Sequence, residues 1–459
     1  MKPTKVSRLL PLVACLAWNA RAVAGPAPVP TLAVIQGQAP EKVKKITLFA
    51  VEEGRKAEIA NAMVDEQHAF AFAIPSPKEG FYYLSVGDRS ADTRIYIKPG
   101  DQLKLKMERG AYSVQAGSVE NKQLWQWQEQ LGTISRHIIL ADTATYMTFF
   151  PKLEVLVPKV TGLKKAVNTP NKKFNELLKY TMDVDVEHAA MAFLLMPHPK
   201  HPEKSQYPAF YKQIIQDKKY CDSKLLANGD AGSIVRLYET FTYIMSTEKR
   251  QGPASLEENA RLFCNDTIKG LFITESLPGF RTFDKLTDAV TPVKQYLITE
   301  NQQQRYLAAE KALRKFAAGE QGFNFAGEDT NGKKVTFNEL KGKVVVVDVW
   351  ATWCGPCKAE LPHLQKLEEE LRGRNVTFVG YSVDETKDKE KWSAFVKEKD
   401  MKGVQLFGAG WSEITKFYDI KGIPRFMVFD QQGKIVTIDA PRPSTPELKA
   451  LIEKTLGKG

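Results

Sequence analysis

The sequence predicts a multidomain protein with an N-terminal antiparallel β sandwich-like domain, a central α-helical domain and a C-terminal α/β domain. Two changes in apolar spacing along the 459 residues indicate this division. Alternation with a period of two gives way to spacings of three and four, and then to apolar runs that alternate with helical segments. The predicted boundaries are 25–119 for the β-rich domain, 120–318 for the helical domain and 319–459 for the α/β domain.

Short alternating runs fill residues 31–117, among them AFAFAIP, FYYLSV and RIYIKPGDQLKLKM. Turn residues interrupt these runs about every ten residues, which is typical of a sandwich or a barrel. In the last run, Leu103 and Leu105 are expected to face a core, while Lys104 between them faces water. The pattern therefore predicts an antiparallel sheet structure that is solvated on one side.

Apolar residues at helical spacing follow in segments such as NKQLWQWQEQL and SLEENARLFCNDTIKGLF. Breaks that contain Pro and Gly separate the segments, and no fixed-length repeat is present. Cys221 and Cys264 are expected in two different helices. Free buried thiols, which are common core residues, are favoured over a disulfide between them.

The segment AAGEQGFNF at 317–325 is expected to be a linker. Beyond it, apolar strand patterns such as KVVVVDVW, VTFVGYSV and RFMVFD alternate with helical patterns. Near-continuous apolar strands that alternate with helices predict a central sheet buried between helices.

The N-terminus has the pattern of a secretory signal peptide over residues 1–24, with a basic start, an apolar stretch and small residues at Ala22–Ala24. An alternative is lipidation at Cys15, which would associate the protein with a membrane, and a retained anchor is a third reading. Four of the positive charges lie in residues 1–24, so the net charge of +11 falls to +7 without them. Because basic and acidic residues are interspersed, no nucleic-acid partner is expected.

The stretch WATWCGPCKAELP, residues 350–362, contains the strongest chemical signal. Cys354 lies where a predicted strand ends and a helix begins, and the free N–H groups of a helix start favour a thiolate. Cys357 lies one turn further on the same helix face. An exposed attacking thiol followed by a shielded resolving thiol is the arrangement that disulfide exchange requires.

Two other interpretations of the cysteine pair are weaker. A structural disulfide that closes so short a loop removes little entropy from the unfolded chain. Zinc prefers four ligands, and the sequence has no second Cys-x-x-Cys. A redox-active Cys354–Cys357 disulfide is therefore expected, without a metal and without any other cofactor.

The motifs VDVWATWCGPC and GIPRFMVFDQQGK resemble those of the TlpA/ResA-like branch of the thioredoxin-fold thiol–disulfide oxidoreductases of bacterial envelopes. The resemblance covers residues 320–459 and implies that fold and that activity. It implies that Pro424 is a cis-proline beside the sulfur atoms. Trp353 and Ile423, which stand next to Cys354 and Pro424, are expected to support the site. Residues 31–120 resemble, more loosely, a β-rich domain of unknown function that often precedes such domains.

The resemblance also points to two carboxylates. Asp348 matches a buried aspartate that accepts the proton of the resolving cysteine, and Glu360 matches a glutamate near that thiol. Independently of the resemblance, an aspartate between apolar Val347 and Val349 should have a raised pKa because of desolvation. The alternatives are a solvated Glu360 and an Asp348 that is only a hydrogen-bonded core residue.

The expected function is an exported thiol–disulfide oxidoreductase of the periplasm or cell envelope that reduces protein disulfides. Its expected partners are protein disulfide substrates and an upstream electron donor. The alternative is a client-binding or chaperone-like envelope protein in which the redox domain is accessory.

Overall fold

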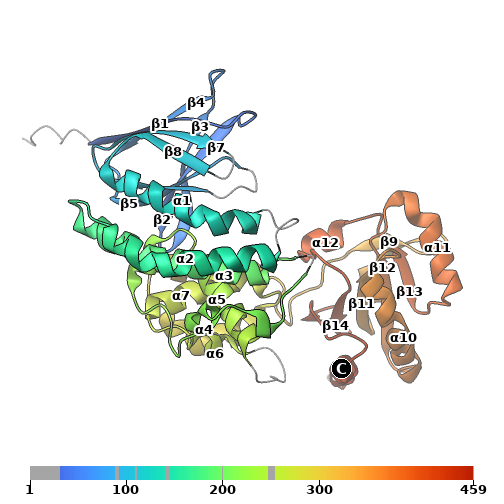
Figure 1. Cartoon of the computed structure of the whole chain (residues 1–459). Helices are drawn as coiled ribbons and strands as arrows, with labels where there is room; N and C mark the ends of the chain where they lie inside the picture. The colour runs from blue at the N-terminus through green and yellow to red at the C-terminus, as the bar shows by residue number, and fades with distance from the viewer. Residues whose placement is uncertain are drawn as a thin grey trace, which may run out of the picture.

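The computed structural model describes residues 31–87, 92–108, 111–139, 145–198, 200–246 and 254–457. The predicted signal peptide and its alternative at Cys15 lie outside the described residues. Figure 1 shows the β-rich region against the first long helices, and the C-terminal α/β region to one side of the helical region. Within the described ranges, no helix has the length and apolar character needed to cross a membrane.

Eight strands form two four-stranded sheets in the β-rich region, with the orders β4-β1-β7-β8 and β3-β2-β5-β6. Side chains of both sheets form one apolar core. Leu103 and Leu105 are buried in it and Lys104 is exposed, as predicted. The strands are β1 (Leu32–Gln38), β2 (Lys45–Glu52), β3 (Arg55–Met63), β4 (Ala69–Pro75), β5 (Gly80–Ser85), β6 (Thr93–Ile97), β7 (Gln102–Glu108) and β8 (Ala111–Ala116).

The prediction of a purely antiparallel β-rich domain is wrong at one pair of strands, since β1 and β7 pair in parallel. Parallel neighbours need a long connection. Here β4 and the whole second sheet (β2, β3, β5 and β6) lie between β1 and β7 in the sequence and supply that connection.

Helices fill the central region and form a second apolar core. The α-helices are α1 (Val119–Ile139), α2 (Tyr146–Ala166), α3 (Lys172–Leu195), α4 (Phe210–Ile214), α5 (Ala231–Met245), α6 (Leu256–Ala260), α7 (Asp266–Ser276), α8 (Phe283–Val290) and α9 (Glu300–Arg314). Short 3-10 turns η1 (Lys204–Gln206), η2 (Ser223–Ala227), η3 (Leu277–Gly279) and η4 (Thr291–Tyr296) connect some of them.

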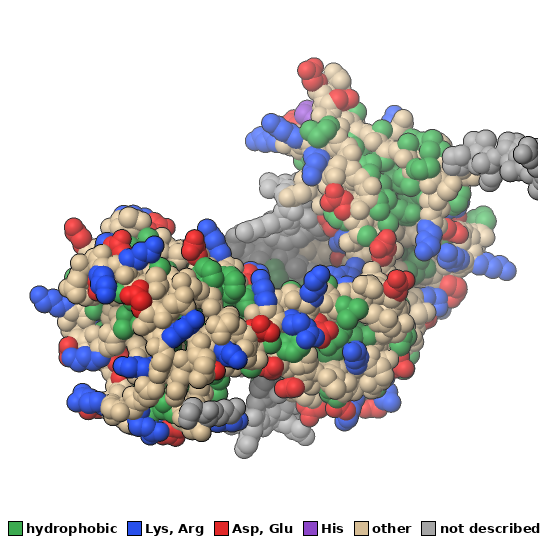
Figure 2. Space-filling model, turned by 180° about the vertical axis from the view of Figure 1, so that it is seen from behind, with side chains coloured by type: hydrophobic (Ala, Val, Ile, Leu, Met, Phe, Trp, Pro, Cys, Tyr) green, Lys and Arg blue, Asp and Glu red, His purple; other side chains and the backbone are tan. Residues whose placement is uncertain are grey.

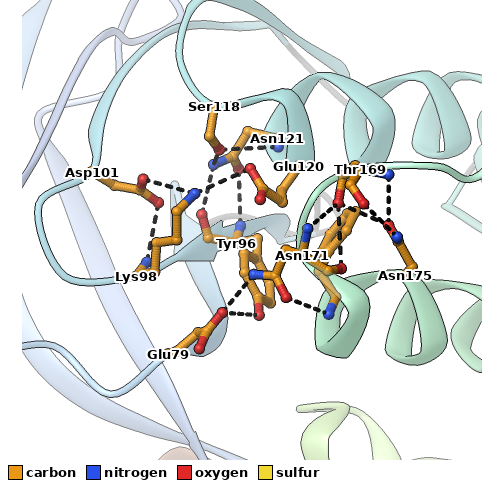
Figure 3. A network of polar contacts seen from close by, with 11 residues as sticks. Glu79, Tyr96, Lys98, Asp101, Ser118, Glu120, Asn121, Thr169, Asn171 and Asn175 are labelled. Atoms are coloured by element: carbon orange, nitrogen blue, oxygen red, sulfur yellow. Dashed lines mark hydrogen bonds and ion pairs between the residues drawn. The ribbon is translucent and has the colours of Figure 1, made fainter.

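Polar contacts join the β-rich region to the helices (Figure 3). The Asn121 side chain at the start of α1 accepts from the Tyr96 N–H at 2.9 Å and donates to the Tyr96 carbonyl at 2.6 Å. Glu79 accepts from the Tyr96 hydroxyl and from Asn171, the residue that caps α3. Nearby, buried Arg94 pairs with buried Asp185 of α3 at 2.8 Å. The sheet that contains β6 therefore contacts the helices through specific hydrogen bonds and an ion pair as well as through apolar packing.

Cys221 and Cys264 form a disulfide, which corrects the expectation of free thiols. Both residues lie in connecting segments rather than in helices. The backbone explains the pairing, because Lys219 N–H donates to the Leu262 carbonyl and Cys264 N–H donates to the Lys219 carbonyl. These bonds hold together two segments whose cysteines are 43 residues apart in the sequence. The spacing of the cysteines alone does not predict this contact.

Replacing both Cys221 and Cys264 by Ser should lower the free energy of unfolding by about 4 kcal/mol, according to the chain-entropy estimate for a loop of this size. Denaturant titration of the helical region measures the loss. Disulfide reduction by folded protein should be unchanged, because the pair is separate from Cys354 and Cys357. A variant as stable as the wild type would show that the backbone bonds alone hold the two segments.

Residues 317–325 are not a free linker. Gly319 N–H donates to the Ile435 carbonyl and Gly322 N–H donates to the Gly433 carbonyl. Phe323 stacks on Phe417, and Phe325 is fully buried. The small and polar composition suggested a flexible joint, but the segment packs as an extra edge of the α/β region.

A seven-stranded sheet organises the C-terminal region, with the order β10-β9-β13-β12-β11-β14-β15. Its central strands β11, β12 and β13 run parallel, and β14 runs antiparallel to β11. Apolar clusters lie on both faces, as predicted. The elements are β9 (Ala326–Glu328), β10 (Lys334–Thr336), η5 (Phe337–Leu340), β11 (Val344–Trp350), α10 (Gly355–Glu370), β12 (Val376–Ser382), η6 (Thr386–Asp388), α11 (Lys389–Glu398), β13 (Val404–Phe407), α12 (Glu413–Phe417), β14 (Arg425–Phe429), β15 (Ile435–Thr437) and α13 (Pro446–Leu456).

Candidate active site

The two cysteines of the CGPC stretch lie between the end of β11 and the first turn of α10. Every residue of β11 is buried, so the strand is fixed on both faces. Cys354 is the N-cap of α10, and its Sγ accepts a hydrogen bond from the Cys357 N–H at 3.2 Å. A sulfur in this position faces the positive end of the helix dipole, which stabilises a thiolate.

Cys354 and Cys357 are joined by a disulfide. Each is only 4% exposed, so the expectation of an exposed attacking thiol is wrong for this oxidised form. The bond holds Cys354 against the helix start, with its sulfur turned toward Cys357. Trp353, beside it, is 53% exposed and forms part of the surface around the pair.

Asp384 holds the loop that carries the cysteines, and sequence reasoning missed it. Its carboxylate accepts from the Thr352 N–H at 2.9 Å, from the Thr352 hydroxyl at 2.7 Å and from the Ser382 hydroxyl at 2.7 Å. The side chain is fully buried. A signal was present, because Asp384 closely follows the apolar run VTFVGYSV, whose strand is parallel to β11 and ends at the same edge.

Asp384→Asn should destabilise the protein by about 2 kcal/mol, because one acceptor is replaced by a donor that faces other donors. The rate of disulfide reduction should fall several-fold as Thr352 loses its anchor. Denaturation curves and initial rates measure the two effects. Glu385→Gln, a neighbouring exposed acid, is the matched control. Equal stability and equal rates of the two variants would show that Asp384 does not support the site.

The Ile423–Pro424 bond is cis, as predicted. β14 begins directly after it, and Arg425 pairs with Val349 near the end of β11. Ile423 and Pro424 therefore lie at the edge of the sheet where β11 ends and the cysteines follow. Both side chains are partly exposed.

Asp348 lies on β11 and is 7% exposed. Val346, two residues earlier, points to the same side of the strand and packs in the cluster beneath α10. Burial raises the pKa of Asp348 to about 8, and the negative charges of Glu360 and Glu368 add to this. The predicted direction of the shift is confirmed. A carboxyl group with this pKa can gain and lose a proton near neutral pH.

Glu360 lies one turn after Cys357 on α10 and is buried, so the solvated alternative is wrong. Ser444 donates to it twice, from its N–H and from its hydroxyl, both at 3.0 Å. Arg442 lies 3.7 Å away. These contacts come from the segment before α13, more than 80 positions later, and the sequence offers no local sign of them.

Among the described residues, no three or more His, Cys, Asp or Glu side chains are grouped so that they could hold a metal ion. Basic and acidic side chains are interspersed over the face that Figure 2 shows.

Comparison with known proteins places the C-terminal region. The family described as Redoxin matches residues 317–452. The thiol-disulfide oxidoreductase ResA of a Bacillus cereus strain is 30% identical over 140 residues, which cover 30% of this chain and 79% of that protein. ResA of Bacillus thuringiensis subsp. konkukian is 33% identical over 122 residues, covering 27% of this chain and 69% of that protein.

A solved structure of a thiol:disulfide interchange protein from Bacteroides sp. is 28% identical to this chain. The match covers 31% of this chain and 92% of that one, with a TM-score of 0.28. Each of these likenesses therefore spans about as much of the chain as the C-terminal α/β region does.

Proposed function

This chain belongs to the TlpA/ResA-like thiol–disulfide oxidoreductases, and from that premise we propose that it reduces disulfides of exported proteins through Cys354 and Cys357. It is a thioredoxin-like oxidoreductase. The observation that carries the proposal is the joint placement of a cysteine pair at a helix start and a buried carboxyl group, Asp348, on the preceding strand.

In the proposed cycle, the Cys354 thiolate attacks one sulfur of a substrate disulfide. An intermolecular S–S bond forms, the substrate bond breaks, and one substrate sulfur leaves as a thiolate that takes a proton from water. Asp348 in its ionised form then accepts the proton of the Cys357 thiol, and the resulting thiolate attacks the Cys354 sulfur. The second substrate thiolate leaves and is protonated, and Cys354 and Cys357 end as a disulfide.

Two features support the assignment of roles. The helix dipole and the Cys357 N–H both stabilise negative charge on Cys354, which makes it the attacking group. Glu360, held by Ser444, places a negative charge near Asp348 and so favours the form of Asp348 that carries a proton. Trp353, Ile423 and Pro424 form the surface that a substrate segment would contact.

The proposed direction is reduction, because Gly-Pro between the cysteines resembles the reducing thioredoxins. An upstream electron donor must then reduce the Cys354–Cys357 disulfide after each turnover. The proposed location is the periplasm or cell envelope, and it rests on the signal-peptide pattern of residues 1–24.

The test is insulin reduction by chain 25–459, with dithiothreitol as the electron source. The wild type should accelerate insulin precipitation, and a Cys354→Ser/Cys357→Ser double variant should equal the blank. A wild-type protein that does not reduce insulin, and whose Cys354–Cys357 disulfide form oxidises a reduced dithiol peptide when dithiothreitol is left out, would reverse the proposed direction.

Residues 25–318 are proposed to dock or select a partner rather than to take part in the chemistry. A fragment that begins at Lys315 should reduce a small disulfide at nearly the rate of chain 25–459. The fragment must include Phe316 and Gly319, because Phe316 is buried in the α/β core and the Gly319 N–H donates a hydrogen bond to the Ile435 carbonyl. A fragment that begins at 320 should melt at a lower temperature.

The comparison of the fragment that begins at Lys315 with chain 25–459 also tests the role of residues 25–318. In a Cys357→Ser background, chain 25–459 should capture more envelope proteins than the fragment does. Equal capture by both proteins would show that residues 25–318 do not select the partner. A fragment that is folded but inactive would show that these residues take part in the chemistry.

A further inference from the structure

Asp348, Gly380 and Gln405 lie side by side on three neighbouring strands. Asp348 of β11 pairs with Gly380 of β12, and Gly380 pairs with Gln405 of β13. Residues in register on neighbouring strands point to the same face of a sheet. The side chains of Asp348 and Gln405 therefore share the face that α10 covers, with only a glycine between them.

Gly380 leaves room for the Gln405 amide. A Cβ atom on residue 380 would meet that amide, with its Cδ at 3.0 Å and its Nε2 at 3.2 Å, and its Oε1 closer still. The amide thus extends from β13 over β12. Because neighbouring strands are about 4.8 Å apart, it stands one strand away from Asp348.

Two buried oxygen atoms border this space. Among the described residues, neither Oδ1 of Asp348 nor Oε1 of Gln405 has a hydrogen-bond partner. Both residues are more than nine-tenths buried, with 7% and 8% exposed. The Gln405 Nε2 already donates to the Lys402 carbonyl at 2.6 Å, so its oxygen is the free end. A carboxylate oxygen and an amide oxygen are both acceptors, and one O–H between them satisfies both.

We propose that Gln405 is a positioning residue that accepts a hydrogen bond from protonated Asp348 across Gly380, directly or through one water molecule. The inference rests on the proposed role of Asp348 as acceptor of the Cys357 proton. When ionised Asp348 takes the proton of the thiol, it gains the O–H that a hydrogen bond to Gln405 needs. Gln405 then stabilises the product of the transfer, which favours the Cys357 thiolate.

The charged groups that act on Asp348 come from α10. They are Glu360, which Ser444 and Arg442 hold, and Glu368, which lies near Lys402. Both carboxylates act through charge alone and disfavour an ionised Asp348. Gln405 differs from these carboxylates because its side chain is neutral and its Oε1 can accept a hydrogen bond from Asp348.

Infrared spectra test the hydrogen bond directly. At pH 6 the carboxylic acid C=O band of Asp348 should be present, and Asp348→Asn should remove it. Gln405→Leu should move this band to higher wavenumber, because the acid loses its partner. Gly380→Ala should do the same by displacing the amide, and it serves if Gln405→Leu does not fold.

Kinetics give the second readout. An aromatic disulfide whose thiolate product absorbs visible light reports attack by Cys354 and resolution by Cys357 as two phases. Gln405→Leu should leave the first phase unchanged and slow the second about tenfold, the factor that the loss of one hydrogen bond gives.

Gln365→Leu is the matched control, because Gln365 also donates its Nε2 to a backbone carbonyl, that of Lys399 at 2.8 Å. It should change neither phase nor the infrared band. An unmoved band and a wild-type second phase in Gln405→Leu would overturn the role of Gln405. If Asp348→Asn also leaves the second phase unchanged, the proposed role of Asp348 itself fails.

Discussion

Cys357→Ser is expected to stop the reaction at a mixed disulfide between Cys354 and the substrate. The variant retains the sulfur at the helix start, so the first attack proceeds, and no second thiol follows to resolve the product. Cys354→Ser should instead lower the rate of disulfide reduction by at least about a thousandfold, the scale on which loss of a covalent nucleophile acts.

Mass spectrometry of the adducts measures both outcomes. The Cys357→Ser protein should carry one substrate molecule per chain on Cys354, and the Cys354→Ser protein should carry almost none. Stable adducts on Cys357 in the Cys354→Ser protein, formed as fast as in the other variant, would reverse the roles of the two residues. Cys221 and Cys264 should remain bonded to each other throughout.

Asp348→Asn is expected to make the protein more stable and less active. The pKa of Asp348 is raised from 3.8 to about 8 in the folded protein. Between these values the unfolded chain releases a proton that the folded chain keeps, so stability falls as the pH rises from about 4 to about 8 and is level above that. Asn has no such proton, and its advantage at pH 7 should be on the order of 4 kcal/mol.

The activity of Asp348→Asn should fall in the resolving step by roughly a hundredfold, the lower end for one acid–base group. Urea unfolding at pH 4 and pH 7 tests the first claim, since the difference between the proteins should nearly vanish at pH 4. Two-phase kinetics test the second. A variant that gains no stability at pH 7 would contradict the burial of an uncompensated carboxyl group.

Local signals made part of the site predictable from sequence. The helix start at Cys354 follows from a buried apolar strand that ends shortly before Gly-Pro, and the burial of Asp348 follows from the valines around it. The cis bond before Pro424 could be predicted only from the resemblance to the family. Each of these features depends on a few consecutive residues.

Features that depend on distant contacts could not be predicted. Ser444 reaches Glu360 from the far end of the domain, and Gln405 approaches Asp348 only through strand register. The Cys221–Cys264 bond depends on backbone pairing between two loops. The 317–325 segment has the composition of a linker and packs because Phe325 fits the neighbouring core.

The most direct test of the central claim is a single-turnover reaction with one equivalent of a disulfide-bonded protein substrate. The protein used has Cys354 and Cys357 as free thiols and the Cys221–Cys264 disulfide intact. Quantitative thiol labelling should find two new substrate thiols per chain and a Cys354–Cys357 disulfide, with Cys221–Cys264 bonded before and after. A substrate that keeps its disulfide while Cys354 and Cys357 remain reduced would contradict the account.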